Sequence, residues 1–177
     1  NSAVACLDTC YQTQGQIWGM TIPKNDVVTA FTPKQAAQLV EQGALTLDKA
    51  DGAQVQLVAV GAYQLGVCQE VKRTLSKQGI QCHITYLLEP GRFRQPRDLY
   101  EQTYVSDVAT RTSLFPNDIR LRVFVCRPLD LGVDQCIAFG YRNQGGTLDT
   151  SGLLRANQSD AQSITTMVMQ NINTGET

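Results

Sequence analysis

Residues 55–88, VQLVAVGAYQLGVCQEVKRTLSKQGIQCHITYLL, decide the expected fold. The opening VQLVAV run has too little polar alternation for a strand with one solvated face, so it predicts a central strand covered on both faces. Gly61 turns the chain into a helix whose apolar face repeats at Val67, Cys68, Val71 and Leu75. Gly79 ends that helix, and IQCHITYLL forms the next strand. The stretch therefore predicts a parallel βαβ unit with a right-handed crossover.

The residues before this unit predict a capped helix followed by a hairpin. Thr32 can cap a helix, with Pro33 at its first position and Gln35 completing a capping box. Gly43 suits the left-handed conformation that ends such a helix. ALTLDKADGAQ then indicates a short strand and a polar turn that leads back to the strand at Val55.

The residues after the unit predict two further strands and a last helix. IRLRVFVC (119–126) and QCIAFGY (135–141) are candidates for the third and fourth parallel strands. Ser159 and Gln162 match a second capping box. The helix that they would begin has an apolar stripe at Ile164, Met167, Val168 and Ile172.

Composition narrows the partners that the chain can have. The 177 residues carry a formal net charge of −1, which favours neither nucleic acid nor an anionic membrane as partner. No apolar run approaches the roughly 20 residues that span a bilayer. We expect a cytoplasmic protein whose six cysteines are reduced and mostly buried. CLDTC lacks metal-site spacing and His83 is the single histidine, so we expect no metal site.

The motifs name one candidate binding cluster and no catalytic set. Gly61 and Gly66 alone do not make a dinucleotide or P-loop fingerprint, and His83 falls inside an expected strand. Arg92, Arg94 and Arg97 follow the carboxyl end of a parallel strand, where α/β sheets place ligands. Guanidinium groups suit phosphates and carboxylates. A domain interface or a solvated loop with surface ion pairs is the alternative for these arginines.

Several stretches together resemble the C-terminal domain of the transketolase superfamily, the thiamine-diphosphate enzymes. Within that superfamily, the chain resembles transketolase and the homodimeric pyruvate dehydrogenase E1 component. Residues 41–90 resemble the opening of that domain, and IAFGYRNQGGTLDTSGLLRANQSDA resembles its closing segment. TPKQAAQLVEQGA resembles the linker into the domain. IWGMTIPKN resembles the last strand of the preceding pyrimidine-binding domain.

The resemblance implies a three-layer α/β/α fold with a mixed, mostly parallel five-stranded sheet. The parallel strands would lie at about 55–60, 81–88, 119–125 and 135–141, with an antiparallel strand near 45–48. Residues 1–31 would be the tail of the pyrimidine-binding domain, 32–44 a linker helix and 45–177 the C-terminal-like domain. Without the sheet of its own domain, the segment before Thr32 would be poorly ordered or packed opportunistically.

The resemblance also implies a role without chemistry of its own. The chain would support dimerisation of a homodimeric transketolase or 2-oxo-acid dehydrogenase and frame the active-site entrance. Thiamine diphosphate and magnesium would bind the enzyme's other domains, because the Gly-Asp-Gly…Asn motif that holds them does not occur here. No histidine lies between Leu88 and Arg127, where pyruvate-type enzymes place one. The alternative is a free-standing α/β module that binds an anionic effector through Arg92, Arg94 and Arg97.

Overall fold

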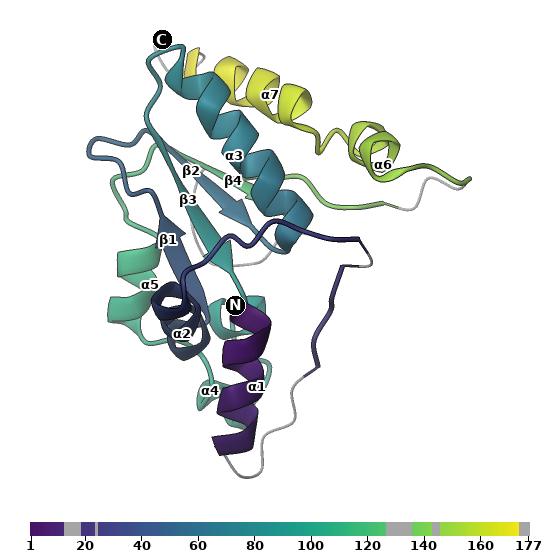
Figure 1. The fold of residues 1–177 in the computed structure, drawn as a ribbon. Coiled ribbons are helices and arrows are strands. Elements are labelled where there is room, and N and C mark those ends of the chain that lie inside the picture. The colour runs from purple at the N-terminus through teal and green to yellow at the C-terminus, as the bar shows by residue number, and fades with distance from the viewer. Residues whose placement is uncertain (13–18, 24, 127–135, 143–145, 174–177) are drawn as a thin grey trace.

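The computed structural model describes residues 1–12, 19–23, 25–126, 136–142 and 146–173. Its described part contains five strands and a series of helices arranged around them (Figure 1). The strands are β1 (Ala44–Leu47), β2 (Val55–Ala59), β3 (Cys82–Leu87), β4 (Leu121–Val125) and β5 (Cys136–Ala138). The helices are α1 (Ser2–Gln12), α2 (Pro33–Gln42), α3 (Ala62–Ser76), the 3-10 turn η1 (Pro90–Phe93), α4 (Leu99–Gln102), α5 (Val108–Leu114), α6 (Thr150–Ala156) and α7 (Ala161–Asn173).

The strands form one mixed sheet in the order β1-β3-β2-β4-β5. β2, β3, β4 and β5 run parallel to one another, and β1 runs antiparallel to β3. All five residues of β2 are buried, as the apolar run predicted, and β2 lies in the centre of the sheet. The predicted α/β fold with one antiparallel strand is confirmed.

The predicted hairpin between β1 and β2 is wrong. β1 pairs with β3, Ala44 opposite Leu87 and Leu47 opposite Ile84, and β3 lies between β1 and β2. Both edges of β2 are occupied by parallel partners, β3 and β4, so the short β1 can add only at the outside. Residues 48–54 cross two strand spacings, about 10 Å, instead of making a tight turn.

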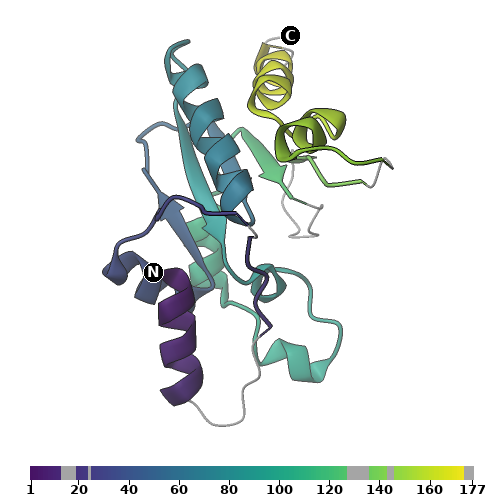
Figure 2. The ribbon, with the colours of Figure 1, turned by 45° about the vertical axis from the view of Figure 1, so that its right-hand side comes forward.

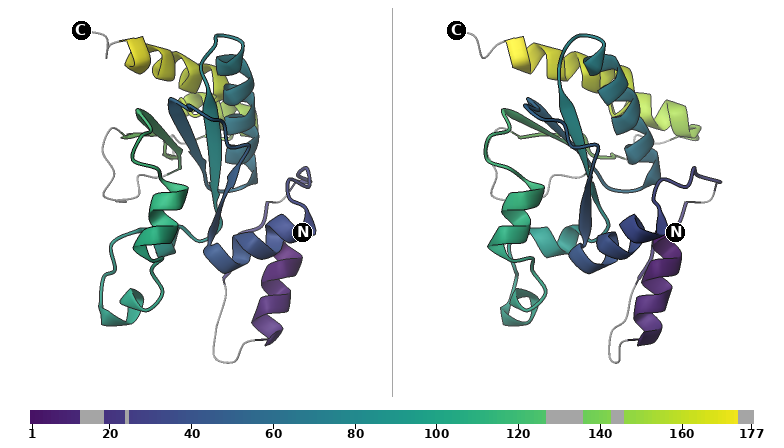
Figure 3. Two further views of the ribbon diagram at one scale, coloured as in Figure 1. Left: turned by 90° about the vertical axis from the view of Figure 1, so that its left-hand side faces the viewer. Right: turned by 60° about the vertical axis from the view of Figure 1, so that its left-hand side comes forward.

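Helices cover the two faces of the sheet in separate layers (Figure 3). On one face α3 and α7 pack together over the larger apolar core, which includes Leu57, Ile84 and Val123. On the other face α5 and the η1 turn enclose a smaller core around Phe93 and Phe124. The alternating register of each strand sends its side chains to the two faces in turn, so both faces of the central strands are buried.

The caps agree with the sequence at α2 and differ at α7. Thr32 and Gln35 form the predicted capping box, and Gly43 ends α2 in the left-handed conformation with φ 74°. At α7 the cap is Asp160, whose carboxylate accepts hydrogen bonds from the Ser163 backbone and hydroxyl. Ser159 was predicted there, but its hydroxyl instead donates to the carbonyl of Leu154 at the end of α6.

The N-terminal residues form a helix that packs against α2 (Figure 2). Cys6 of α1 is buried, and the Asn1 side chain donates to the Phe31 carbonyl. The stretch IWGMTIPKN (17–25), which resembles a strand in the sequence, lies partly outside the described residues, and 19–22 have no regular secondary structure. Within the described ranges, no helix is both long and apolar enough to cross a membrane.

The six cysteines make no disulfide. Burial raises the pKa of the Cys68 thiol well above its ordinary value and raises those of Cys82 and Cys126 to about 11. Cys136 was expected in the core but is exposed, because it begins β5, the short strand at the edge of the sheet.

Candidate functional site

The three arginines predicted to bind an anion do not gather in one place. Arg92 leaves the η1 turn and reaches back to the end of α2. Its Nη1 donates to the carbonyl of Glu41 at 2.9 Å and to that of Val40 at 3.4 Å, and it lies 3.9 Å from the Glu89 carboxylate. Carbonyls at a helix C-terminus lack intrahelical donors, so Arg92 caps α2 with a charged donor.

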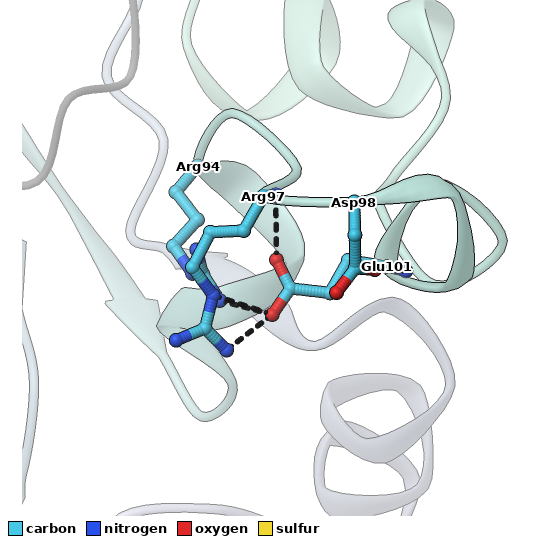
Figure 4. Close-up of polar contacts among 4 residues, drawn as sticks. All are labelled: Arg94, Arg97, Asp98 and Glu101. Carbon is cyan, nitrogen blue, oxygen red and sulfur yellow. Dashed lines mark hydrogen bonds and ion pairs between the residues drawn. The ribbon is translucent and has the colours of Figure 1, made fainter.

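Arg94 and Arg97 meet instead at Glu101, the third residue of α4 (Figure 4). Arg94 Nη2 lies 2.6 Å from Glu101 Oε1, and Arg97 Nε donates to the same oxygen at 2.7 Å. The backbone N–H of Arg97 donates to Oε2 at 2.8 Å, and Asp98 caps the helix by accepting from the Glu101 N–H. Two guanidinium groups thus share one carboxylate.

These hydrogen bonds shift the protonation of the cluster. The Arg97 contacts, with a smaller contribution from Arg94, lower the pKa of Glu101 to about 2. The same contact with Glu101 raises the pKa of Arg97. The Arg97 side chain is still 73% exposed, so it remains accessible from solvent. Arg94 is covered to a greater degree and acts mainly to hold Glu101.

A second polar cluster lies inside the fold, near the amino ends of the central parallel strands, whereas the three arginines follow the carboxyl end of β3. Gln56, His83 and Arg122 are each the second residue of a central strand, and the register aligns them side by side. All three are buried. They occupy the face that α5 covers, beyond the apolar residues of the smaller core.

Hydrogen bonds tie most of this row to its surroundings. Gln56 Nε2 donates to Thr85 Oγ1 at 2.8 Å and to the Leu114 carbonyl at 2.6 Å, and Gln56 Oε1 accepts from Arg122 Nε at 3.1 Å. Arg122 Nη2 also donates to the Pro116 carbonyl. The network joins the sheet to the end of α5 and to the turn before β4.

His83 stands apart from that network. Its side chain is 3% exposed, and neither ring nitrogen has a hydrogen-bond partner among the described residues. Burial lowers its pKa, and the nearby charges of Lys49, Lys72 and Arg122 lower it further against the opposing effect of Asp118. The ring lines a cavity of about 160 Å³.

The sequence interpretation placed His83 correctly in a strand but did not find this cluster. A signal was present, because each of three apolar strands carries one polar residue at its second position. Only the register shows that Gln56, His83 and Arg122 are neighbours. The interpretation also grouped the arginines of residues 92–97 by proximity along the chain, which the structure separates into a helix cap and a surface cluster.

Neither cluster resembles a metal centre. Across the described ranges, no three His, Cys, Asp or Glu side chains gather closely enough to hold a cation. The glycine turn before α3 has Gly61 at φ 95°, but it carries neither a dinucleotide nor a P-loop fingerprint. Among the described residues, no cluster of side chains offers the ligands for a magnesium-pyrophosphate group.

No family model matches the chain, and no curated protein matches it by sequence. Solved transketolases match its structure. Transketolase from Leishmania mexicana superposes with a TM-score of 0.59 at 12% identity over 80% of this chain. A mutant transketolase from Pichia stipitis gives 0.57 at 16% identity over 77%, and the Campylobacter jejuni enzyme gives 0.53 at 18% over 74%.

In each case the match covers 19% of the transketolase chain, so the chain spans about a fifth of the length of the solved structures that it resembles. The identities are too low to carry residue roles across, but the shared sheet and helices extend over most of the present chain. The chain has the fold of a transketolase domain, the α/β C-terminal-like type that its sequence indicates.

Proposed function

We propose that the chain is the C-terminal domain of a thiamine-diphosphate-dependent enzyme of the transketolase type. The observation that carries the proposal is the structural match to transketolases over 74–80% of the chain. In this role the chain supplies no catalytic residue and binds no cofactor itself. Thiamine diphosphate, when bound to the other domains, supplies the carbanion chemistry. The proposal also includes the 2-oxo-acid dehydrogenase E1 component. The fold alone does not distinguish an enzyme that acts on a ketose phosphate from one that acts on a 2-oxo acid.

The proposed division of the chain has residues 1–31 as the tail of a pyrimidine-binding domain, 32–44 as a linker and 45–177 as the domain. The exposure of the first segment supports it. Tyr11 is 89% exposed, Ile22 68% and Val28 91%, and apolar side chains so exposed suit a surface that meets another domain.

A second apolar surface supports a role in assembly. Four large side chains on α4, α5 and the turn between them are exposed, and we refer to them as the α4–α5 patch: Leu99, Tyr100, Tyr104 and Val108. The rings of Tyr100 and Tyr104 pack together with centroids 5.1 Å apart and present one joint surface. Exposed tyrosines beside an arginine such as Arg97 are typical of the centre of protein interfaces. We assign this patch to the contact with the rest of the enzyme or with its second subunit.

The proposal is tested by first reading the coding sequence on either side of the chain. We expect the neighbouring coding sequence to encode domains that contain the Gly-Asp-Gly…Asn motif. Otherwise, a protein that co-purifies with the chain should contain these domains. Calorimetric titration with thiamine diphosphate and magnesium should then give heat for the complete enzyme and none for residues 1–177 alone. Micromolar cofactor binding by these residues alone, or the lack of any thiamine-binding partner, would refute the proposal.

The α4–α5 patch has its own test in the complete enzyme. Tyr100→Lys should weaken subunit or domain association, measured by sedimentation as a function of concentration. Tyr141→Lys is the matched control, since Tyr141 is 55% exposed on the loop after β5 and outside the patch. Equal association for both variants would remove the patch from the interface.

The second candidate function is anion binding at Arg97. The 73% exposure of its side chain, which leaves the guanidinium accessible from solvent, favours this role. Arg97→Ala in the active enzyme should then raise the Michaelis constant for an anionic substrate and leave kcat unchanged. An unchanged Michaelis constant would show that Arg97 does not bind the substrate and only pairs with Glu101.

A further inference from the structure

The environment of His83 is unusual for a buried imidazole. A neutral imidazole has one N–H donor and one acceptor nitrogen, and buried polar atoms of this kind nearly always have partners. The described protein groups give neither nitrogen one. Its neighbours in the same row, Gln56 and Arg122, bond to each other and to carbonyls of the α5–β4 connection. In this row, His83 is therefore the residue whose side-chain donor and acceptor have no hydrogen-bond partner among the described protein groups.

The cavity beside the ring offers a route to a partner. It has a volume of about 160 Å³, well above the roughly 10–15 Å³ that a single water requires. Its wall includes the polar side chains of Gln42, Thr46, Lys49 and Ser113 in addition to His83. Lys49 and Ser113 are exposed, so the cavity opens to solvent between α5 and the end of β1. It can therefore admit a small solute without unfolding.

The charge around the cavity selects the kind of solute. The lining residues include one ammonium group, Lys49, and no carboxylate. The charged groups that act on the ring are Lys49, Lys72 and Arg122 against the single carboxylate of Asp118. An ammonium, amide N–H groups and a hydroxyl around one small space are donors that suit an oxyanion, and the volume accommodates only a few heavy atoms.

We propose that the cavity between His83 and Lys49 is a binding site for a small oxyanion, of the size of phosphate or a short carboxylate. The anion accepts a hydrogen bond from the ammonium of Lys49 at the mouth. Both ring nitrogens of His83 are buried in the structure, so the His83 N–H donates to the anion only after the ring turns toward the cavity. Phosphate and carboxylate share this chemistry, and the site stands independently of the proposed enzymatic role.

The single histidine makes the site directly observable. Imidazole resonances of the chain come from His83 alone, so NMR titration reports on the cavity without assignment of other residues. At fixed pH and ionic strength, sodium chloride should leave these resonances in place. Either phosphate or acetate should shift them along a saturable curve with a dissociation constant in the millimolar range, and the stronger of the two identifies the ligand class. A bound anion should also raise the pKa of His83, because it stabilises the imidazolium form.

Variants separate specific binding from a general salt effect. Lys49→Gln should weaken binding of the anion about twofold to fivefold, as expected for removal of an exposed charge. Lys77→Gln is the matched control, an exposed lysine at the end of α3 on the opposite face of the sheet, and should leave the affinity unchanged. His83→Leu should abolish the rise in melting temperature that the anion gives, while the protein still melts cooperatively.

The same experiments can overturn the proposal. The proposal fails if neither phosphate nor acetate shifts the His83 resonances more than chloride does. It also fails if Lys49→Gln and Lys77→Gln weaken binding of the anion equally. If His83→Leu does not fold, the two lysine variants decide the question. None of these outcomes depends on thiamine binding or on the identity of the complete enzyme.

Discussion

Replacing Arg92 by alanine tests whether the arginines after β3 are structural or bind a ligand. The structure assigns Arg92 to the C-terminus of α2, where its Nη1 donates to the Glu41 carbonyl at 2.9 Å. A hydrogen bond to a charged group contributes about 1.5–3 kcal/mol when well buried. The Arg92 side chain is 28% exposed, the Val40 bond is long and the Glu89 pair is loose, so water can replace part of what is lost.

We therefore expect Arg92→Ala to reduce the free energy of unfolding by about 1–2 kcal/mol, near the lower end of that range. For a chain of this size the melting temperature should fall by about 2–8 °C. Urea denaturation followed by circular dichroism measures the change, with an unchanged m-value showing that the same surface is exposed on unfolding. Arg92→Lys should recover part of the loss, since an ammonium keeps the charge but not the geometry of the guanidinium.

Arg97→Ala is the comparison, because Arg97 lies in the same loop and is 73% exposed. It should leave the melting temperature close to that of the unchanged protein. If Arg92→Ala were as stable as the unchanged protein and instead weakened binding of an anionic substrate, the cap interpretation would be refuted. The grouping of the three arginines as one ligand site would then be restored.

Three further predictions concern the core and the pH dependence. Phe93→Ala should destabilise the protein by about 3–5 kcal/mol in urea denaturation, because the ring is fully buried and packs against Phe115. A loss under about 1 kcal/mol would contradict this packing. An aromatic disulfide reagent should modify the exposed Cys136 rapidly and Cys68 only on unfolding, since burial raises the Cys68 pKa and shields the thiol. Mass spectrometry locates the label, and fast modification of Cys68 in the folded protein would contradict the prediction. Because the folded pKa of Glu101 is lowered to about 2 from 4.5, its pairing with the arginines should remain intact above pH 4.5 and be lost as the pH falls toward 2. The cluster is exposed, so the accompanying change in stability should be small, in line with the small effect of Arg97→Ala. Carboxyl NMR should place the Glu101 midpoint at about 2, and a midpoint at the ordinary value would show that the pairing does not persist in solution.

The sequence alone determined the elements that depend on neighbours along the chain. The apolar run at 55–60 is a buried central strand, and Thr32, Gln35 and Gly43 cap α2 as predicted. Local steric and hydrogen-bonding preferences decide such features within a few residues. The cap of α7 was missed by one residue, because Ser159 and Asp160 both suit the position and the end of α6 takes the Ser159 hydroxyl.

Only the tertiary structure decided which strands are neighbours and what each arginine contacts. A hairpin with β2 would have given β1 the partner nearest along the chain. Both sides of β2 are occupied by parallel partners, so β1 pairs with β3 instead. Arg92 reaches the end of α2 because Gly43 accepts hydrogen bonds from the backbone after β3, which brings segments far apart in sequence together. His83, Gln56 and Arg122 became one row through strand register. Register is a property of the whole sheet, fixed by burying both of its faces at once, and no single strand encodes it.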